Sequence, residues 1–240
     1  MKKIVLFCSL CLSSTLYADS HWGYSHQNAP SHWASLDQKY QACAGFNQSP
    51  INISQTTKSQ LERLKLNYTS TSKSIVNNGH TVQVDFNEGN ILELDGKKFN
   101  LKQFHLHSPS ENTIQGKSYP MEMHLVHASD QGELAVIAIM YEQGVENQKL
   151  VNLWQNLPQK AGTVFYPQQQ EAAQSFIPDK LDYYRFNGSL TTPPCTEGVR
   201  WIVLKDIQQA SALQIKSFTE VLSEPNNRPI QSINARVILE

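Results

Sequence analysis

Four of the eight histidines in the sequence fall in two short segments, 103–107 and 122–127. In an extended strand, side chains two residues apart point to the same face of the sheet. His105 and His107 therefore share one face of the first segment. If His124 of the second segment lies on a neighbouring strand, three imidazoles meet at one point. Such a cluster could bind a metal ion.

Three neutral imidazoles suit Zn²⁺, which in catalytic sites commonly has three protein ligands and one open position for water. Gln103 and Glu122 share the face of the clustered histidines, and each can accept a hydrogen bond from an imidazole N–H. His127 is an odd number of positions from His124, so we expect it to face away and to be a buried, hydrogen-bonded structural residue. The spacing predicts a metal site but does not by itself identify the metal or the reaction.

The elements that must position these histidines are mainly strands. Residues 81–86 alternate between apolar and polar side chains, which predicts a half-buried strand. Residues 91–99 are interrupted by Asp95-Gly96, a pair typical of a tight hairpin turn. The continuous apolar run at 134–140 predicts a strand that is covered on both faces.

A shorter apolar run at 201–204 predicts a further buried strand. Helical periodicity is confined to residues 150–157 and 212–222, and Pro158 and Pro225 stop the two patterns. Such stripes are typical of helices whose apolar face packs on a core. Because no linker-like change in composition and no internal repeat divides the chain, we expect one domain in which strands dominate.

The N-terminus has the pattern of a Sec-type export signal in residues 1–18. Lys2 and Lys3 precede an apolar stretch, and Ala18 is a small residue before the expected cleavage site. The stretch is too short to be a bilayer-spanning anchor. We therefore expect cleavage and export of residues 19–240 to the periplasm, and the sequence leaves full secretion open.

Charge and cysteine content narrow the class of protein. Charged residues make up 17% of the chain and are scattered, and the formal net charge is −1, so nothing favours a nucleic-acid partner. Cys43 and Cys195 are the cysteines outside the signal, and in an oxidising compartment we expect them to form one disulfide. Two unrelated buried thiols are the alternative.

Eight motifs occur in an order and spacing that are specific when taken together: HWGY at 21–24, QSPINI at 48–53, NNGH at 77–80, QFHLH at 103–107, SEN at 110–112, EMHLVH at 122–127, GSLTTPPC at 188–195 and NRP at 227–229. With these motifs the chain resembles the alpha-class carbonic anhydrases, especially exported bacterial ones, from His21 to Arg236. The resemblance implies a mainly β (α+β) fold in residues 19–240, with a large, twisted, mostly antiparallel central sheet and a few short peripheral helices. It also implies zinc in a cone-shaped cavity and the reversible hydration of carbon dioxide to bicarbonate and a proton.

The same resemblance assigns roles to individual residues. It makes His105, His107 and His124 the zinc ligands, in agreement with the strand argument. Glu111 would accept a hydrogen bond from the Thr191 hydroxyl, so that the Thr191 oxygen can only accept one from a zinc-bound hydroxide, the nucleophile. From sequence pattern alone, Thr191 would be an ordinary turn residue.

Regeneration of the nucleophile requires export of a proton, for which a residue that titrates near neutrality is best suited. His80 matches the family's shuttle position, and an idle surface histidine is the alternative. Tyr24, Asn78 and Gln83 would belong to a solvent network, and Thr192 would contact bicarbonate. The resemblance further implies an apolar wall that holds carbon dioxide, for which plain core packing is the alternative, at Val126, Val136, Leu190, Val199 and Trp201.

Two other functions are compatible with parts of the pattern. A cupin metalloenzyme would use His105, His107 and Glu111 together as ligands, although the second cupin motif is missing. A non-catalytic zinc-binding protein on the same fold is the other alternative.

Compared with many relatives, Asn112 replaces a histidine at a position that is neither a ligand nor part of the hydroxide relay. The sequence leaves open whether the protein forms a homodimer.

Overall fold

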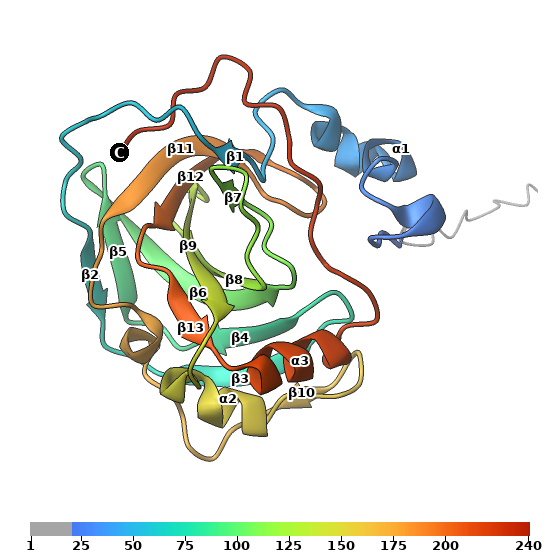
Figure 1. Ribbon diagram of the computed structural model, residues 1–240, viewed down its shortest axis with the longest axis vertical. Coiled ribbons are helices and arrows are strands. Elements are labelled where there is room, and N and C mark those ends of the chain that lie inside the picture. The colour runs from blue at the N-terminus through green and yellow to red at the C-terminus, as the bar shows by residue number, and fades with distance from the viewer. Residues whose placement is uncertain (1–20) are drawn as a thin grey trace, which may run out of the picture.

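The computed structural model describes residues 21–240 and shows a large curved sheet with short helices at its periphery (Figure 1). The expected export signal lies outside the described residues. The strands and α-helices are β1 (Asn52–Ile53), β2 (Lys65–Tyr68), β3 (Ser72–Asn77), β4 (Val82–Phe86), β5 (Asn90–Leu94), β6 (Lys97–His107), β7 (Thr113–Ile114), β8 (Met121–Ala128), β9 (Leu134–Gln143), β10 (Val164–Phe165), β11 (Tyr183–Ser189), β12 (Glu197–Leu204), β13 (Gln208–Ala210), α1 (Trp33–Leu36), α2 (Val151–Gln155) and α3 (Ala212–Val221). Short 3₁₀ helices occur at His26–Asn28, Gln38–Ala44, Gln148–Leu150 and Ala173–Phe176.

The central sheet has eleven strands, and eight of them follow the order β10-β3-β4-β6-β8-β9-β12-β11. Strand β9 pairs in parallel with β12 and with β13, whereas the other pairings of this sheet are antiparallel. The expectation of a mostly antiparallel central sheet is therefore confirmed. Strands β6 and β8, which carry the clustered histidines, are neighbours near its centre.

The predicted hairpin joins β5 to β6. Asp95 and Gly96 have φ angles of 53° and 70°, the left-handed region that a two-residue turn of this kind requires. The turn allows β6 to continue for eleven residues across the sheet. The hairpin prediction is confirmed, and it sets where the first two histidines enter the interior.

One face of the central sheet packs on the main apolar core. Val82, Val84 and Phe86 of β4 belong to this core, which confirms the alternation predicted for that strand. Strand β9 contributes Ile137 to the main core and Val136 to a second apolar cluster on its other face. The prediction of a strand covered on both faces is therefore confirmed for β9.

Strand β6 contains a β-bulge that changes which face its residues occupy. The register between β6 and β8 shifts between Leu101 and Gln103, so Lys102 has no partner residue in β8. After the bulge, Phe104 and Leu106 lie in the main core. Residues 103, 105 and 107 consequently face the opposite side of the sheet, where the site is built.

The helices pack at the periphery, and α2 and α3 contact each other (Figure 1). Helix α2 is shorter than its apolar periodicity indicated, because a 3₁₀ turn precedes it and Leu157 lies beyond its end, although still buried. Helix α3 begins with a capping box in which Ser211 and Gln214 exchange hydrogen bonds. Its residue Phe218 is fully buried, as expected of a core-facing stripe.

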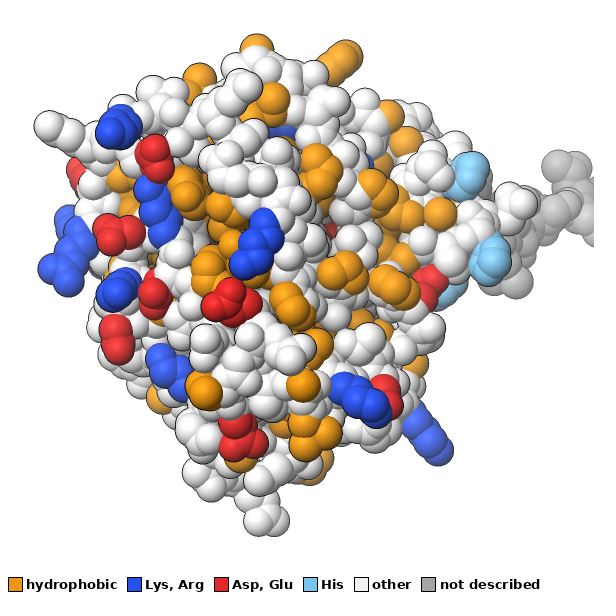
Figure 2. Space-filling view, viewed as in Figure 1, with side chains coloured by type: hydrophobic (Ala, Val, Ile, Leu, Met, Phe, Trp, Pro, Cys, Tyr) orange, Lys and Arg blue, Asp and Glu red, His pale blue; other side chains and the backbone are white. Residues whose placement is uncertain are grey.

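Charged side chains of both signs are interspersed on the face shown in Figure 2. Within residues 21–240, no helix has the length and apolar character needed to cross a membrane.

Candidate metal centre and its surroundings

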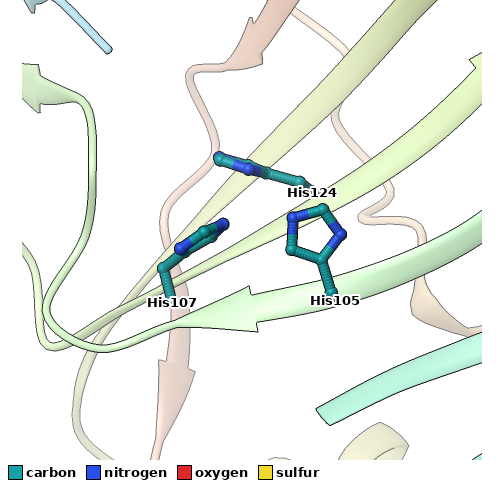
Figure 3. Close-up of side chains that lie close together, drawn as sticks. All are labelled: His105, His107 and His124. Carbon is teal, nitrogen blue, oxygen red and sulfur yellow. The ribbon is translucent and has the colours of Figure 1, made fainter. Parts of the chain in front are cut away.

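The three clustered histidines converge on one point, as strand parity predicted (Figure 3). His105 of β6 lies directly opposite His124 of β8, and His107 is two residues further along β6. One ring nitrogen of each lies within 4.8 Å of those of the other two. Their ring centroids are 4.6 to 5.4 Å apart. These three residues could therefore bind one metal ion.

Two of the rings lie beside the acceptors that the sequence predicted. The Nδ1 atom of His105 donates to Oε1 of Gln103 over 2.9 Å, a geometry that leaves Nε2 as the free nitrogen. In the other ring, Nε2 of His124 lies 2.9 Å from Oε1 of Glu122 without hydrogen-bond geometry. Anchoring one ring nitrogen fixes the tautomer and directs the lone pair of the other nitrogen.

The third ring is oriented by a residue that the sequence did not indicate. Nδ1 of His107 donates to the backbone carbonyl of Asn226 over 2.7 Å. Asn226 is 119 residues away in the chain and lies in an irregular segment next to the NRP motif, which was the available signal. The Nε2 atom of His107 is buried and has no hydrogen-bond partner. A buried nitrogen without a partner fits a position that is meant for a metal ion.

Burial keeps the cluster neutral. It is the main cause that lowers the pKa of His105, His107 and His124. The charges of neighbouring histidines lower the pKa of His105 and His124 further. A neutral imidazole offers the lone pair that a divalent metal requires. The donor set and its protonation state both fit zinc.

Glu122 is held by more than its contact with the cluster. It accepts hydrogen bonds from the backbone N–H groups of Glu111 and Asn112 and from the Asn112 side-chain amide, over 2.7 to 2.8 Å. Sequence reasoning gave Asn112 no part in the site, although it follows Glu111 directly in the SEN motif. In the structure, Asn112 contacts the acceptor that orients His124.

The structure brings Glu111 and Thr191 together. Glu111 is fully buried, and its Oε1 accepts from the backbone N–H of Arg228 over 2.9 Å. Burial raises its pKa well above the usual value, while the hydrogen bonds from Arg228 and from the Thr191 side chain act in the opposite direction. Oε2 of Glu111 lies 3.3 Å from Nε2 of His107. The Glu111 carboxylate is therefore next to the free nitrogen of His107.

The cluster opens into a cavity of about 110 Å³. Eight of the residues that line it were expected around the reaction centre, namely Tyr24, Asn78, His80, Gln83, Gln103, His105, His107 and Thr192, and the lining also includes Trp22 and Thr81. Trp22 received no role from the sequence. Its ring stacks on that of His80 with centroids 3.8 Å apart and an interplanar angle of 8°.

The groups around the cavity mouth differ in their charge behaviour. Burial, followed by the charge of His21, lowers the pKa of His80, whereas the charge of Glu224 raises it. Burial and then the charges of Glu111 and Glu224 raise the pKa of Tyr24. The Tyr24 hydroxyl is therefore neutral, and His80 is held mainly in its neutral form at pH 7.

Two amides at the cavity are already engaged with protein groups. Oδ1 of Asn78 accepts from the backbone N–H groups of His80 and Thr81 over 2.9 Å, and so builds the turn that carries His80. Nε2 of Gln83 donates to Oδ1 of Asp85 over 2.6 Å. Each amide retains one polar group that can face solvent in the cavity.

The expected wall residues form one apolar surface beside the cluster. The ring of Trp201 lies edge-on to that of His124 with centroids 4.9 Å apart. Two partly buried residues pack against the second apolar cluster, to which the other wall residues belong. The partly buried pair is Val126 and Leu190, and the buried members are Val136, Val199 and Trp201.

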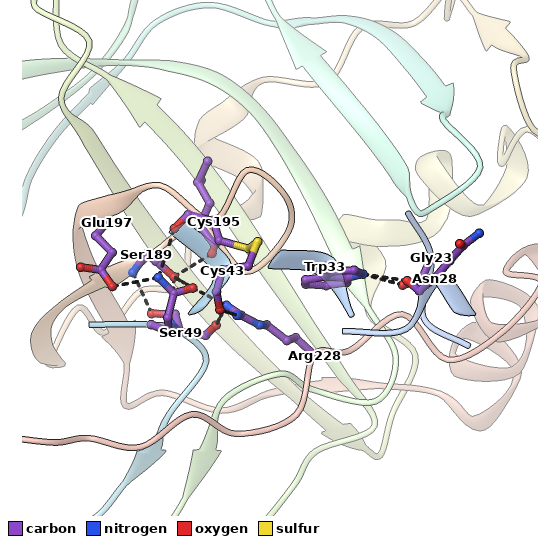
Figure 4. The surroundings of a disulfide bond; sticks show 11 residues. Gly23, Asn28, Trp33, Cys43, Ser49, Ser189, Cys195, Glu197 and Arg228 are labelled. Atoms are coloured by element: carbon purple, nitrogen blue, oxygen red, sulfur yellow. Dashed lines mark hydrogen bonds between the residues drawn. A yellow bond between two sulfur atoms is a disulfide. The ribbon is translucent and has the colours of Figure 1, made fainter. Parts of the chain in front are cut away.

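The expected disulfide joins Cys43 to Cys195 (Figure 4). Cys195 is four residues after Thr191, so the bond attaches the Thr191 segment to the N-terminal part of the chain. The Arg228 guanidinium donates to the backbone carbonyl of Cys43 over 2.9 Å and lies over the ring of Trp33. Arg228 thus connects the surroundings of the disulfide to Glu111.

The group that could bind a metal contains the three histidines and does not include Glu111. A cupin site would require that glutamate as a ligand, so the geometry does not support the cupin alternative. The eleven-stranded sheet is also the fold implied by the resemblance to carbonic anhydrases.

Comparisons with known proteins agree with this geometry. Residues 28–240 match the family model described as eukaryotic-type carbonic anhydrase. The chain is 45% identical to a carbonic anhydrase of Pectobacterium carotovorum, with 99% of this chain and 98% of the relative covered. A carbonic anhydrase of Neisseria gonorrhoeae is 42% identical, with coverage of 99% and 94%.

A solved structure extends the agreement to three dimensions. It is the alpha-carbonic anhydrase of Thermovibrio ammonificans in complex with the inhibitor sulfanilamide. It superposes with a TM-score of 0.91 at 42% identity and covers 93% of this chain and 100% of its own. The protein belongs to the alpha-class carbonic anhydrase family.

Proposed function

We propose that the protein catalyses the reversible hydration of carbon dioxide at a zinc ion bound by His105, His107 and His124. The observation that carries this proposal is the convergence of three neutral imidazoles, two of them buried and that of His105 partly buried, with a ring nitrogen of each close to those of the other two. Membership of the carbonic anhydrase family supports the reaction. A bound zinc ion would supply Lewis acidity, which in carbonic anhydrases makes a hydroxide nucleophile available at about pH 7, a general property of this metal centre.

The Thr191–Glu111 pair would orient the nucleophile. The Thr191 hydroxyl would donate a hydrogen bond to the Glu111 carboxylate, which would leave the Thr191 oxygen as an acceptor. An acceptor at this position aligns the nucleophile by one hydrogen bond. The buried contact in which the Arg228 backbone N–H donates to Glu111 supports this role, because it fixes the carboxylate that would accept the hydrogen bond from Thr191.

Carbon dioxide has no charge, so its binding would depend on apolar contact. Trp201 and the valines beside it form a wall next to His124 that suits such a molecule. Thr192 lines the cavity and would contact the bicarbonate product.

His80 would carry the product proton from the cavity to buffer. It lines the cavity, belongs to a turn and is about half-buried, so its ring can contact both interior water and solvent. Tyr24, Asn78 and Gln83 would order the water molecules between His80 and the reaction centre.

The expected cellular location is also a proposal. Residues 1–18 would be cleaved, and residues 19–240 would be exported to the periplasm. The disulfide between Cys43 and Cys195 supports an oxidising compartment.

The test combines metal analysis of the purified protein with stopped-flow measurement of carbon dioxide hydration. We expect one zinc per chain, loss of activity after chelation and recovery on addition of zinc. Zinc binding without hydration activity would favour the non-catalytic alternative. A protein that does not bind zinc would refute the proposal.

A further inference from the structure

The segment 224–228, which follows α3, runs along the edge of the site. Its alternate residues contact three different parts of the machinery. Arg228 contacts Glu111, Asn226 contacts His107, and Oε1 of Glu224 accepts from the backbone N–H of Tyr24 over 3.0 Å. The first two contacts serve the metal centre. The contact of Glu224 is directed at the mouth of the cavity, and none of the roles above uses it.

Glu224 holds the N-terminal segment that covers the proton shuttle candidate. This segment, residues 22–24, presents the Trp22 ring against which His80 stacks. On one side it is tied by the Trp33 indole, which donates to the carbonyl of Gly23 over 2.8 Å. On the other side it is tied by Glu224, which accepts from the Tyr24 backbone N–H. The same carboxylate also lies close to Gly23, since a Cβ atom added to that glycine would be 3.5 Å from it.

Glu224 also acts on the charge of His80. Burial and the charge of His21 favour the neutral imidazole, and Glu224 is the group that favours the protonated one. The other close neighbours are uncharged: the Trp22 ring stacks on the imidazole, and the Asn78 and Asn226 amides bind its backbone. The balance at His80 therefore depends on one carboxylate from the far end of the chain.

We propose that Glu224 is a positioning residue for proton transfer, which holds residues 22–24 against the His80 ring and stabilises the positive charge of that ring while it carries a proton. The inference rests on the proposed function, because His80 has to cycle between its two protonation states in that reaction. A shuttle is most effective when its pKa lies near the working pH. Burial and His21 lower the pKa of His80, and Glu224 offsets part of this shift.

The first experiment uses Glu224→Gln, which removes the charge and keeps an oxygen that can accept from Tyr24. The His80 ring is titrated by NMR in the wild type and the variant. Loss of a negative neighbour disfavours the imidazolium, so we expect the pKa of His80 to fall below its wild-type value. Glu220→Gln is the matched control, since Glu220 is exposed on α3 and pairs with Lys216. An unchanged His80 pKa in Glu224→Gln would overturn the proposal.

The second experiment measures carbon dioxide hydration by the zinc-loaded variants. In dilute buffer we expect kcat of Glu224→Gln to fall roughly two- to threefold, with kcat/KM unchanged, because proton export limits only kcat. Concentrated imidazole buffer should restore kcat. Glu224→Ala, which also loses the contact with Tyr24, should show the larger fall.

The outcomes separate this inference from the proposed function. A wild-type protein that binds zinc but does not hydrate carbon dioxide refutes the proposed function, and the inference with it. An active wild type combined with equal falls of kcat and kcat/KM in Glu224→Gln refutes the inference alone. In that case Glu224 would support the fold of the site and would not assist proton transfer.

Discussion

The metal centre and the cavity mouth use histidine in opposite ways. At the metal centre, His105, His107 and His124 lie on central strands, and each has one nitrogen 2.7 to 2.9 Å from a protein acceptor. At the mouth, His80 belongs to a turn, and its ring is held by stacking on Trp22. Ligands need a fixed direction, whereas a shuttle has to exchange its proton with water. The difference shows that burial and anchoring decide what a histidine can do.

The largest effect is expected when one of the oriented histidines of the metal centre is removed. His107→Ala removes one of three ligands, so we expect loss of zinc and a fall of hydration activity to the background rate. Metal analysis and stopped-flow kinetics measure both quantities. His32→Ala, at an exposed position outside the cavity, is the control and should retain zinc and activity. Stoichiometric zinc in His107→Ala would contradict the ligand assignment.

A second change leaves the ligands intact and removes the orienting hydroxyl. Thr191→Ala should lower kcat/KM about a hundredfold, because a positioned hydrogen-bond partner of the nucleophile is lost. Zinc content should stay at one per chain. Thr191→Ser retains the hydroxyl and should recover most of the activity. If Thr191→Ala lost zinc, its role would be structural support of the centre.

A substitution at the mouth of the cavity is expected to lower activity less than one at the metal centre. His80→Ala should lower kcat roughly tenfold in dilute buffer and leave kcat/KM unchanged, since other proton acceptors can replace the side chain. Stopped-flow measurements at increasing imidazole concentration should show recovery of kcat. Failure of imidazole to restore turnover would count against the shuttle role.

The smallest effect on activity is expected at His127, which faces the opposite side of the sheet from the metal centre. It is fully buried and contacts the Tyr68 hydroxyl, as the parity argument predicted for a structural histidine. Burial lowers its pKa from 6.5 to about 4. Between these values the unfolded chain binds a proton that the folded chain does not, so stability falls as the pH falls.

This linkage predicts that His127 accounts for about 2 kcal/mol of the stability lost between pH 7 and pH 5. Urea unfolding at the two pH values should show a smaller loss in His127→Gln than in the wild type. An equal pH dependence in the two proteins would exclude His127 as a source of acid sensitivity. Activity at pH 7 should be nearly unchanged in the folded variant.

Sequence reasoning succeeded where a side chain's neighbours follow from local periodicity. The alternation in β6 and β8 predicted both the convergence of His105 with His124 and the orientation of His127. It could not find Asn226 or Arg228, because both contact the site from an irregular segment more than a hundred residues away. The pairing of Glu111 with Thr191 needed the family resemblance for the same reason.

Side chains that act through others were also hidden. Asn112 belongs to the site because its side-chain amide donates to Glu122, and nothing in its local sequence pattern indicates that contact. The extent of α2 was overestimated, because a stripe of apolar residues does not distinguish an α-helix from a 3₁₀ turn followed by a buried loop residue.

The bulge at Lys102 allows the two halves of β6 to set the orientation of their side chains separately. Before it, Phe99 and Leu101 alternate in step with the hairpin, and after it, Phe104 and Leu106 alternate in step with the ligands. The unpaired residue shifts the alternation of side chains by one position between these two halves of the strand. The outer end of the strand can therefore be redesigned for solubility or attachment, while the inner half retains the orientation that directs its imidazoles.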